Sequence, residues 1–252
     1  MLFGGYLTRS NRINRINKIN RINIREVMYI HKKGYGVIAT MFTIIVLITV
    51  MAVMLLDAFL ETTHWPIIAG IIIIGVIIFI WSVTFFRVPT KRKITREENA
   101  VISSADGEIV AIEEVEEKEY FHDKRIQISV FMSAYDVHVN WFPMDGVVSY
   151  VKYHPGKKMF AVNPKSSELN ERNSVVVKDA KGREVLFRQV AGIMARRIVC
   201  NVKVGDKAEA GKEFGMIKFG SRVDFFLPCD ADIQVEMGDD ITGQVSVLAY
   251  LK

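Results

Sequence analysis

A glycine–serine pair near the C-terminal end of the chain has the residue types needed for self-cleavage. The run that contains it reads FGMIKFGSRV, in which Ser221 directly follows Gly220. A serine hydroxyl in this position can attack the carbonyl carbon of Gly220 and convert the peptide bond into an ester, since glycine tolerates the strained backbone required. Elimination and hydrolysis then leave a pyruvoyl group at a new N-terminus, which forms a Schiff base with an amine and accepts electrons. The alternative is an ordinary turn, which isolated Gly-Ser pairs usually mark.

Histidine is the natural acid or base for such chemistry, because its pKa lies near neutrality. His138 lies in a strand-like setting between Val137 and Val139. A lone histidine in such a place is more often a satisfied core residue than a catalytic one. The other four histidines are expected at the edges of apolar runs (His31 and His64), in a solvated loop (His122) and in a turn (His154).

Three runs together resemble the phosphatidylserine decarboxylases, in the short form with Gly-Ser at the cleavage site. They are FGMIKFGSRVD around Ser221, FMSAYDVHVNWFPMDG around His138, and FFRVP at residues 85–89. The resemblance covers residues 85–228. It implies a pyruvoyl-dependent enzyme, made as a proenzyme, that releases carbon dioxide from phosphatidylserine and leaves phosphatidylethanolamine. A cut between Gly220 and Ser221 would give a β piece, 1–220, and an α piece, 221–252, held together without a covalent link.

The resemblance also implies roles for two further residues. Phe131, Asp136, His138, Pro143, Asp145 and Gly146 are the matching marks of the second run, and they make His138 the catalytic histidine. Many family members carry another histidine three positions later, where this chain has Trp141, so the step that His138 serves is left open. Asp106 matches an Asp-Gly of the family that orients and charge-stabilises the base. The alternative for Asp106 is a plain Asp-Gly turn.

The phosphate of a phospholipid would need cationic side chains or backbone N–H groups. Four basic residues lie in stretches that resemble the family, and they are Lys165, Arg172, Arg196 and Arg197. For each of them, a solvated surface charge or a structural ion pair is the alternative.

Two long uncharged runs predict a transmembrane helical hairpin. Tyr35–Leu56 and Pro66–Phe86 are each long enough to cross a bilayer, which takes about 20 helical residues. Lysines and arginines flank the outer ends of the pair, and the short connection has none, so the positive-inside rule puts both ends in the cytoplasm. We therefore expect an inner-membrane protein with a cytoplasmic catalytic domain. A pair of buried core helices is the alternative.

The first 33 residues are expected to form a basic low-complexity tail. Residues 10–23 repeat Asn-Arg/Lys-Ile with a period of three, which matches neither helix nor strand burial. Six basic residues and one acid in residues 1–27 account for the whole net charge of +5, so the charge does not indicate nucleic-acid binding by the folded part. The tail could touch anionic lipid, or Met28 could be the true start, which is slightly favoured.

The remainder of the chain has the pattern of a mainly β domain with barrel-sandwich-like sheets. We expect three regions: the tail (1–33), the hairpin (34–88) and the decarboxylase domain (89–252). Short helices are expected at Glu97–Ser103 and near Ser166–Asn170. The predicted strands are Glu108–Glu113, Ile126–Phe131, Val147–Tyr153, Ser174–Lys178, Glu184–Val190, Ile198–Val202 and Ile233–Glu236.

A non-enzymatic function is the second hypothesis. The turn from Val204 to Lys212 resembles that of biotinyl/lipoyl-type domains, which would suit a membrane-tethered adaptor, but it gives no reason for the FGS run. Cys200 and Cys229 show no metal-ligand spacing and are expected to be reduced thiols, and no metal is expected. The family resemblance allows a homodimer.

Overall fold

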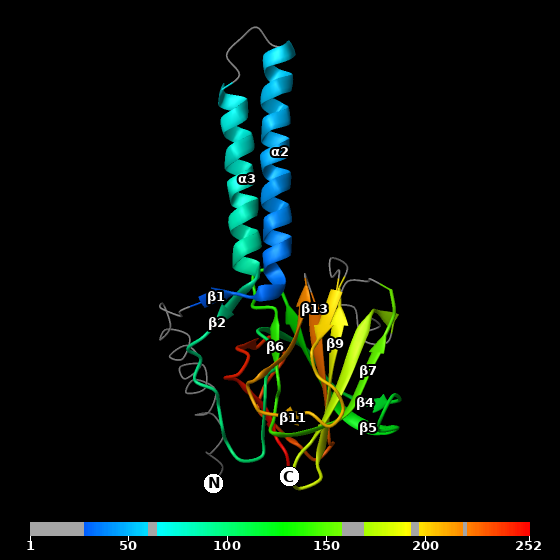
Figure 1. Cartoon of the computed structure of the whole chain (residues 1–252). Helices are drawn as coiled ribbons and strands as arrows, with labels where there is room; N and C mark the ends of the chain where they lie inside the picture. Colours follow the sequence, from blue (N-terminus) through cyan, green and yellow to red (C-terminus); the bar gives the residue numbers. More distant parts are fainter. Residues whose placement is uncertain (1–27, 60–64, 158–168, 193–196, 219–220) are drawn as a thin grey trace, which may run out of the picture.

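The structure is a computed structural model of the single chain. It describes residues 28–59, 65–157, 169–192, 197–218 and 221–252. Its two parts are a pair of long helices and a β domain at the base of that pair (Figure 1).

The helices are α2 (Tyr35–Phe59), which follows a 3₁₀ turn at Lys32–Gly34, and α3 (Trp65–Phe85). They lie side by side, and Gly75 allows close contact, because a Cβ there would come within 2.7 Å of Ile45. Both are long and apolar enough to cross a membrane. Their apolar side chains are mostly exposed, which contradicts the alternative of buried core helices.

A two-stranded ribbon joins the start and the end of the helical pair. It consists of β1 (Met28–Ile30) and β2 (Arg87–Pro89), which are antiparallel with Met28 opposite Pro89. The ribbon brings the chain entering α2 next to the chain leaving α3, at the face of the β domain that meets the helices.

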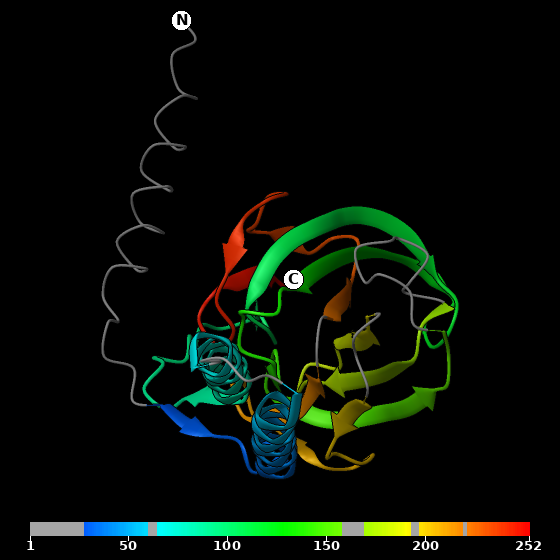
Figure 2. The same cartoon turned by 90° about the horizontal axis from the view of Figure 1, so that it is seen from above.

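The main sheet has eight strands and is curled into a half-barrel, which confirms the expectation of a mainly β domain (Figure 2). Its order is β11-β7-β8-β9-β13-β5-β4-β15, and every neighbouring pair is antiparallel. The strands are β4 (Gly107–Glu117), β5 (Asp123–Met132), β7 (Gly146–His154), β8 (Arg172–Lys178), β9 (Glu184–Ala191), β11 (Lys207–Ala208), β13 (Ser221–Leu227) and β15 (Asp240–Ile241).

Two three-stranded sheets pack beside the main sheet. One has the order β10-β12-β6 and the other β14-β16-β3. Their strands are β3 (Ala100–Ile102), β6 (Val139–Trp141), β10 (Arg197–Cys200), β12 (Glu213–Lys218), β14 (Asp232–Ile233) and β16 (Val247–Tyr250). Side chains of all three sheets form the main core, including Val130, Phe187, Phe214, Phe225 and Leu248.

Most predicted strands are present, but some local expectations were wrong. Glu97–Ser103 contains β3 and no helix, because Ala100–Ile102 pairs with β16. His154 is the last residue of β7, not a turn residue, and it is held by Glu119. His122 does lie in the β4–β5 turn with a φ of 53°. Of Ser166–Asn170 only the last two residues are described, and His64 lies outside the described residues.

Candidate active site

Ser221 is the first residue of the central strand β13. This strand is hydrogen-bonded on both sides, with Ser221 opposite Met132 of β5 and Ala191 of β9. The side chain is completely buried, and its Oγ lies 3.4 Å from the sulfur of Met132. Gly220 lies outside the described residues. The alternative, an ordinary turn, would leave the serine hydroxyl exposed. Here the hydroxyl is buried at the start of a strand.

A network of buried amides lies next to Ser221. The sulfur of Met132 also accepts from Asn140 Nδ2 at 3.8 Å, and Asn140 Oδ1 accepts from Gln189 Nε2 at 2.8 Å. Both amide side chains are fully buried. Neither amide was predicted from the sequence, although Asn140 lies two residues after His138 and side chains two apart in a strand share a face.

His138 lies just before β6 and is fully buried. Its Nδ1 lies 2.9 Å from the carbonyl oxygen of Asp136, which can only accept, so Nδ1 carries the proton of the neutral ring. Nε2 is buried and has no hydrogen-bond partner in the part of the chain that the structure describes. The available lone pair on Nε2 is what a general base requires, and it is unlike a satisfied core histidine.

The pKa of His138 is lowered to about 4. Burial is the main cause, since it penalises the charged imidazolium. The carbonyl of Asp136 and the charge of Asp106 oppose this effect, while the positive charge of Arg87 adds to it. His138 is therefore neutral at physiological pH.

Two main-chain connections link His138 to the serine. Ser133–Val137 leads from Met132, the strand partner of Ser221, directly to His138. The carboxylate of Asp136 holds this segment by accepting from the backbone N–H and the hydroxyl of Ser133, both at 2.7 Å. On the other side, the N–H of Ile217, four residues before Ser221, donates to the carbonyl of His138 at 3.2 Å.

Asp106 is paired with an arginine. Arg92 donates to both carboxylate oxygens, at 2.5 and 2.7 Å, and the N–H of Gly243 donates to Oδ1 at 2.8 Å. Arg92 also lies over the ring of Trp141, 5.3 Å from its centroid, so the residue at the second-histidine position supports this pair. Among the described residues Asp106 makes no hydrogen bond to His138, whose Nδ1 is held by Asp136 instead, and the charge of Asp106 is the smallest of the effects on the pKa of His138. Arg92 is one of the basic residues that follow the second apolar run, and nothing in the sequence indicates its contact with Asp106.

The four candidate phosphate ligands are only partly described. The Nε of Arg172, the first residue of β8, lies 3.9 Å from Glu119 Oε2. Lys165 and Arg196 lie outside the described residues, and for Arg197 only the place of its backbone in β10 is described. Arg172 pairs across the sheet with Val190, next to Ala191 opposite Ser221, so it lies at the same end of the sheet as the serine.

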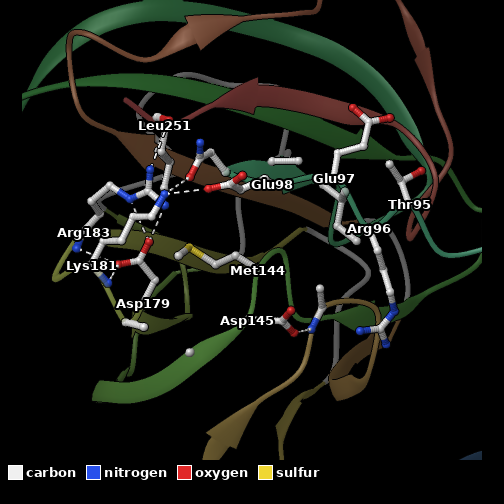
Figure 3. A pocket seen from close by; sticks show the side chains of 16 residues that line it. Thr95, Arg96, Glu97, Glu98, Met144, Asp145, Asp179, Lys181, Arg183 and Leu251 are labelled. Atoms are coloured by element: carbon white, nitrogen blue, oxygen red, sulfur yellow. Dashed lines mark hydrogen bonds and ion pairs between the residues drawn. The ribbon is translucent and has the colours of Figure 1, made fainter.

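Two cavities lie in the β domain, and the second of them is bordered by the candidate site residue Asp106. One of about 500 Å³ lies near the C-terminus, at the other end of the main sheet, and its lining includes the ion pairs of Lys181 with Glu98 and of Arg183 with Asp179 (Figure 3). A cleft of about 340 Å³ is bordered by Asp106, Ser133 and Asp136. Since further carboxylates line this cleft, it favours cationic groups.

Comparisons with known proteins agree with these observations. A family model described as phosphatidylserine decarboxylase matches residues 78–249. A phosphatidylserine decarboxylase proenzyme of Amoebophilus asiaticus is 53% identical over 172 residues, 68% of this chain and 76% of that protein. A proenzyme of the same name from Parabacteroides distasonis is 41% identical over 224 residues, 89% of this chain and 99% of that protein. The buried Ser221 and the neutral His138 are thus found in a chain that belongs to the phosphatidylserine decarboxylase family.

Proposed function

We propose that this chain is a phosphatidylserine decarboxylase proenzyme that cleaves itself between Gly220 and Ser221. The observation that carries the proposal is the place of Ser221, buried at the start of a strand that is paired on both sides. Family membership supports the substrate, since the relatives are named for phosphatidylserine. The product is phosphatidylethanolamine, with release of carbon dioxide.

Self-cleavage uses groups of this chain. Ser221 Oγ attacks the carbonyl carbon of Gly220, His138 Nε2 receives the hydroxyl proton, and the amide nitrogen leaves as the amine while an ester forms. Loss of the α-proton of residue 221 expels the Gly220 carboxylate. Addition of water and loss of ammonia then complete the keto group at residue 221. Asp106 stabilises the protonated histidine by its charge.

The surroundings of residue 221 fit a small keto group. They are the apolar Ala191 and Met132 together with the neutral amide of Asn140, which can donate to an oxygen. The group would supply a carbonyl that combines with the substrate amine and withdraws electrons from the bond to its carboxylate. In the second reaction His138 holds or returns a proton, and the acidic cleft beside Asp136 favours the approach of the ammonium group.

The proposal also covers how the chain is held at the membrane and where the lipid headgroup binds. We propose that α2 and α3 cross the inner membrane, with the tail (1–33) and the decarboxylase domain (89–252) in the cytoplasm and the hairpin (34–88) between them. Ser221 and Arg172 lie at the same end of the main sheet. The strand β12, which leads to Ser221, ends at Lys218, and Lys218 contacts Lys33 at the start of the helical pair, so a headgroup would enter there from the bilayer. Lys165, Arg172, Arg196 and Arg197 are proposed to bind its phosphate. A homodimer remains compatible with this arrangement.

The test is an assay of cleavage and decarboxylation on one set of variants. Wild-type chain in detergent micelles with carboxyl-labelled phosphatidylserine should release labelled carbon dioxide and show the 32-residue α piece on gels. Ser221→Ala should remain one band and release none. Ser149→Ala is the matched control, because its hydroxyl lies on β7, where it contacts Val176 at 3.5 Å and the side chain of Tyr120 rather than a residue next to Ser221. Cleavage that persists in Ser221→Ala, or a cut wild type that releases no label, would refute the proposal.

A further inference from the structure

The last residue of helix α3 is in direct contact with the candidate base. The ring of Phe85 lies 4.0 Å from the imidazole of His138, centroid to centroid, with the planes tilted by 37°. Both side chains are buried. A residue at the end of an apolar helix long enough to span a bilayer therefore forms one wall of the catalytic site.

This contact is part of a larger cluster, which we call the exit cluster. It joins the chain leaving α3 to the strand after His138 and to the strand before Ser221. Its buried members are Phe85, Phe86, Val88, Val137, Val139, Trp141 and Met216. Ile30, Val37 and Ile38, from the start of the helical pair, pack against it. Both ends of the helical pair are therefore fixed to the catalytic segments.

Polar contacts fix the same junction. His31 Nδ1 accepts from the N–H of Lys33, so its Nε2 carries the proton and donates to Glu213 Oε1 at 3.0 Å. The N–H of His31 donates to the carbonyl of Phe86 at 2.8 Å. Lys218 Nζ donates to the carbonyl of Lys33 at 3.2 Å. Glu213 and Lys218 are the first and last residues of β12, the strand that leads to Ser221.

We propose that Phe85 is a positioning residue for His138, so that the seating of the membrane helices sets the orientation and hydration of the catalytic base. This inference rests on the proposed function. The Nδ1 hydrogen bond to Asp136 fixes one edge of the imidazole, and the Phe85 ring fixes its plane. The same ring covers His138 and keeps water from it, which leaves Nε2 available for a proton.

The titration of His138 reports on this arrangement. The groups that face it are Arg87 from β2, Asp106 from the segment before β4, and the carbonyl of Asp136. Burial outweighs them and lowers the pKa of His138 to about 4. Loss of the Phe85 ring would admit water, so the pKa should rise toward its ordinary value of 6.5.

The experiment compares Phe85→Leu and Phe85→Met with the parent chain. Both keep apolar volume and lose the flat ring, so either variant is sufficient if the other does not fold. Phe79→Leu is the matched control, since Phe79 is on the same helix and its ring contacts Phe42 instead, at 5.8 Å. Phe85→Trp keeps an aromatic ring at this position and should therefore behave like the parent chain.

The first readout is the NMR titration of histidine-labelled chain that carries Ser221→Ala, in micelles. The second readout is the rate of self-cleavage in chains that keep Ser221.

The expected result is a rise of at least about one unit in the His138 midpoint in the two Phe85 variants. Their self-cleavage should slow about tenfold or more, because small displacements of a catalytic group are costly. Phe79→Leu should match the parent in both readouts. An unmoved midpoint and a normal rate in the Phe85 variants would overturn this inference alone. A wild-type chain that is never cut would refute the proposed function instead.

Discussion

His138 differs from an ordinary core histidine in the atom that it leaves available. Nδ1 is committed to a backbone carbonyl, whereas Nε2 is buried without a hydrogen bond to any described residue. Burying an unsatisfied polar atom costs about 1–3 kcal/mol, so the fold retains an arrangement that is unfavourable for stability alone. Such an arrangement is typical of a functional site.

His138 should make the protein less stable in weak acid. Its pKa is about 4 when folded and 6.5 when unfolded, so the unfolded chain binds the proton first as the pH falls. The free energy of unfolding should therefore fall by about 3 kcal/mol as the pH falls from 6.5 to 4. Denaturant unfolding of Ser221→Ala at several pH values measures this loss. His138→Gln in the same background should flatten the curve over that range, and an unchanged slope would contradict the assignment.

The contributions of Asp106 and Arg92 to the free energy of unfolding should be coupled. Their side chains are 13% and 7% exposed, so removing either leaves a largely buried charge unpaired. We expect Arg92→Gln to lower the free energy of unfolding by about 3–5 kcal/mol. The double variant with Asp106→Asn should recover part of that loss, as a double-mutant cycle would detect. Strict additivity of the two single losses would show that the pair is not coupled.

Among the residues of the candidate site, those proposed to react were easier to predict from the sequence than their partners. Ser221, His138 and Asp106 were predicted because each lies in a run that resembles the family. Arg92 and Phe85 were not assigned to the site, because a basic residue and an aromatic residue beside a membrane run have an obvious local explanation. Their contacts with Asp106 and His138 arise from folding, over 14 and 53 positions along the chain.

Among the strands, β13 is the one on which the proposed reaction depends. It lies between β5 and β9, and all its side chains are buried. A cut before Ser221 would free the end of this strand without removing its hydrogen bonds to either neighbour. The α piece also includes β16, which pairs with β3 of the β piece. This supports the expectation that the two pieces stay together.

The start of β4 depends on Gly107. Its φ is +149°, and a Cβ there would lie 2.0 Å from the carbonyl oxygen of Phe131 in β5. Gly107→Ala must therefore separate the two strands next to Asp106, at a cost above the 1–3 kcal/mol of backbone strain alone. Gly205→Ala is the control, because Gly205 has a φ of +93° with open space around it. Denaturant midpoints should fall much further for Gly107→Ala, and equal losses would contradict this explanation.

Most of the long strands could be predicted from the sequence, whereas several of the short ones could not. β4, β5, β7, β8 and β9 have apolar patterns bounded by turn residues, which are local signals. β3 and β6 have three residues each, and their strand character comes from pairing with distant segments. The helix expected over Glu97–Ser103 failed for this reason, since local propensity there is overridden by pairing with β16.

At the scale of the whole molecule, a buried network of charged side chains connects the end of β4 to strands β7, β8 and β9 of the curled sheet. Glu119, just beyond β4, contacts Arg188 of β9 at 3.0 Å, His154 of β7 at 2.8 Å and Ser174 of β8 at 3.1 Å. Glu117 also binds Arg188, at 3.0 Å. Burial alone would raise the pKa of Glu117, but hydrogen bonds from the backbone N–H groups of residues 119–121, together with Arg188, lower it overall.

Arg188 should therefore be important for stability. Arg188→Met would leave Glu117 and Glu119 without their common partner, at a cost of about 3–5 kcal/mol. The matched control is Lys124→Met, since Lys124 pairs with Glu114 in solvent and should be dispensable. Thermal unfolding of both variants, made with Ser221→Ala, checks this. Similar melting temperatures for the two variants would contradict the role of the network.

The helices and the β domain meet in the exit cluster, which contacts the segments that carry His138 and lead to Ser221. Sequence patterns predicted the two apolar helices and the β domain separately. They could not predict this junction, because it combines residues near 30, 85, 140 and 216. If the proposed function holds, the bilayer and the catalytic centre are connected through Phe85.

Intact-mass spectrometry of the purified chain tests the central claim most directly. The proposal predicts two masses, a β piece that ends at Gly220 and an α piece of 32 residues, 221–252. The α piece should be about 17 Da lighter than one that begins with serine, because ammonia is lost when the keto group forms. A single mass for the uncut chain, with an ordinary serine at position 221, would contradict it.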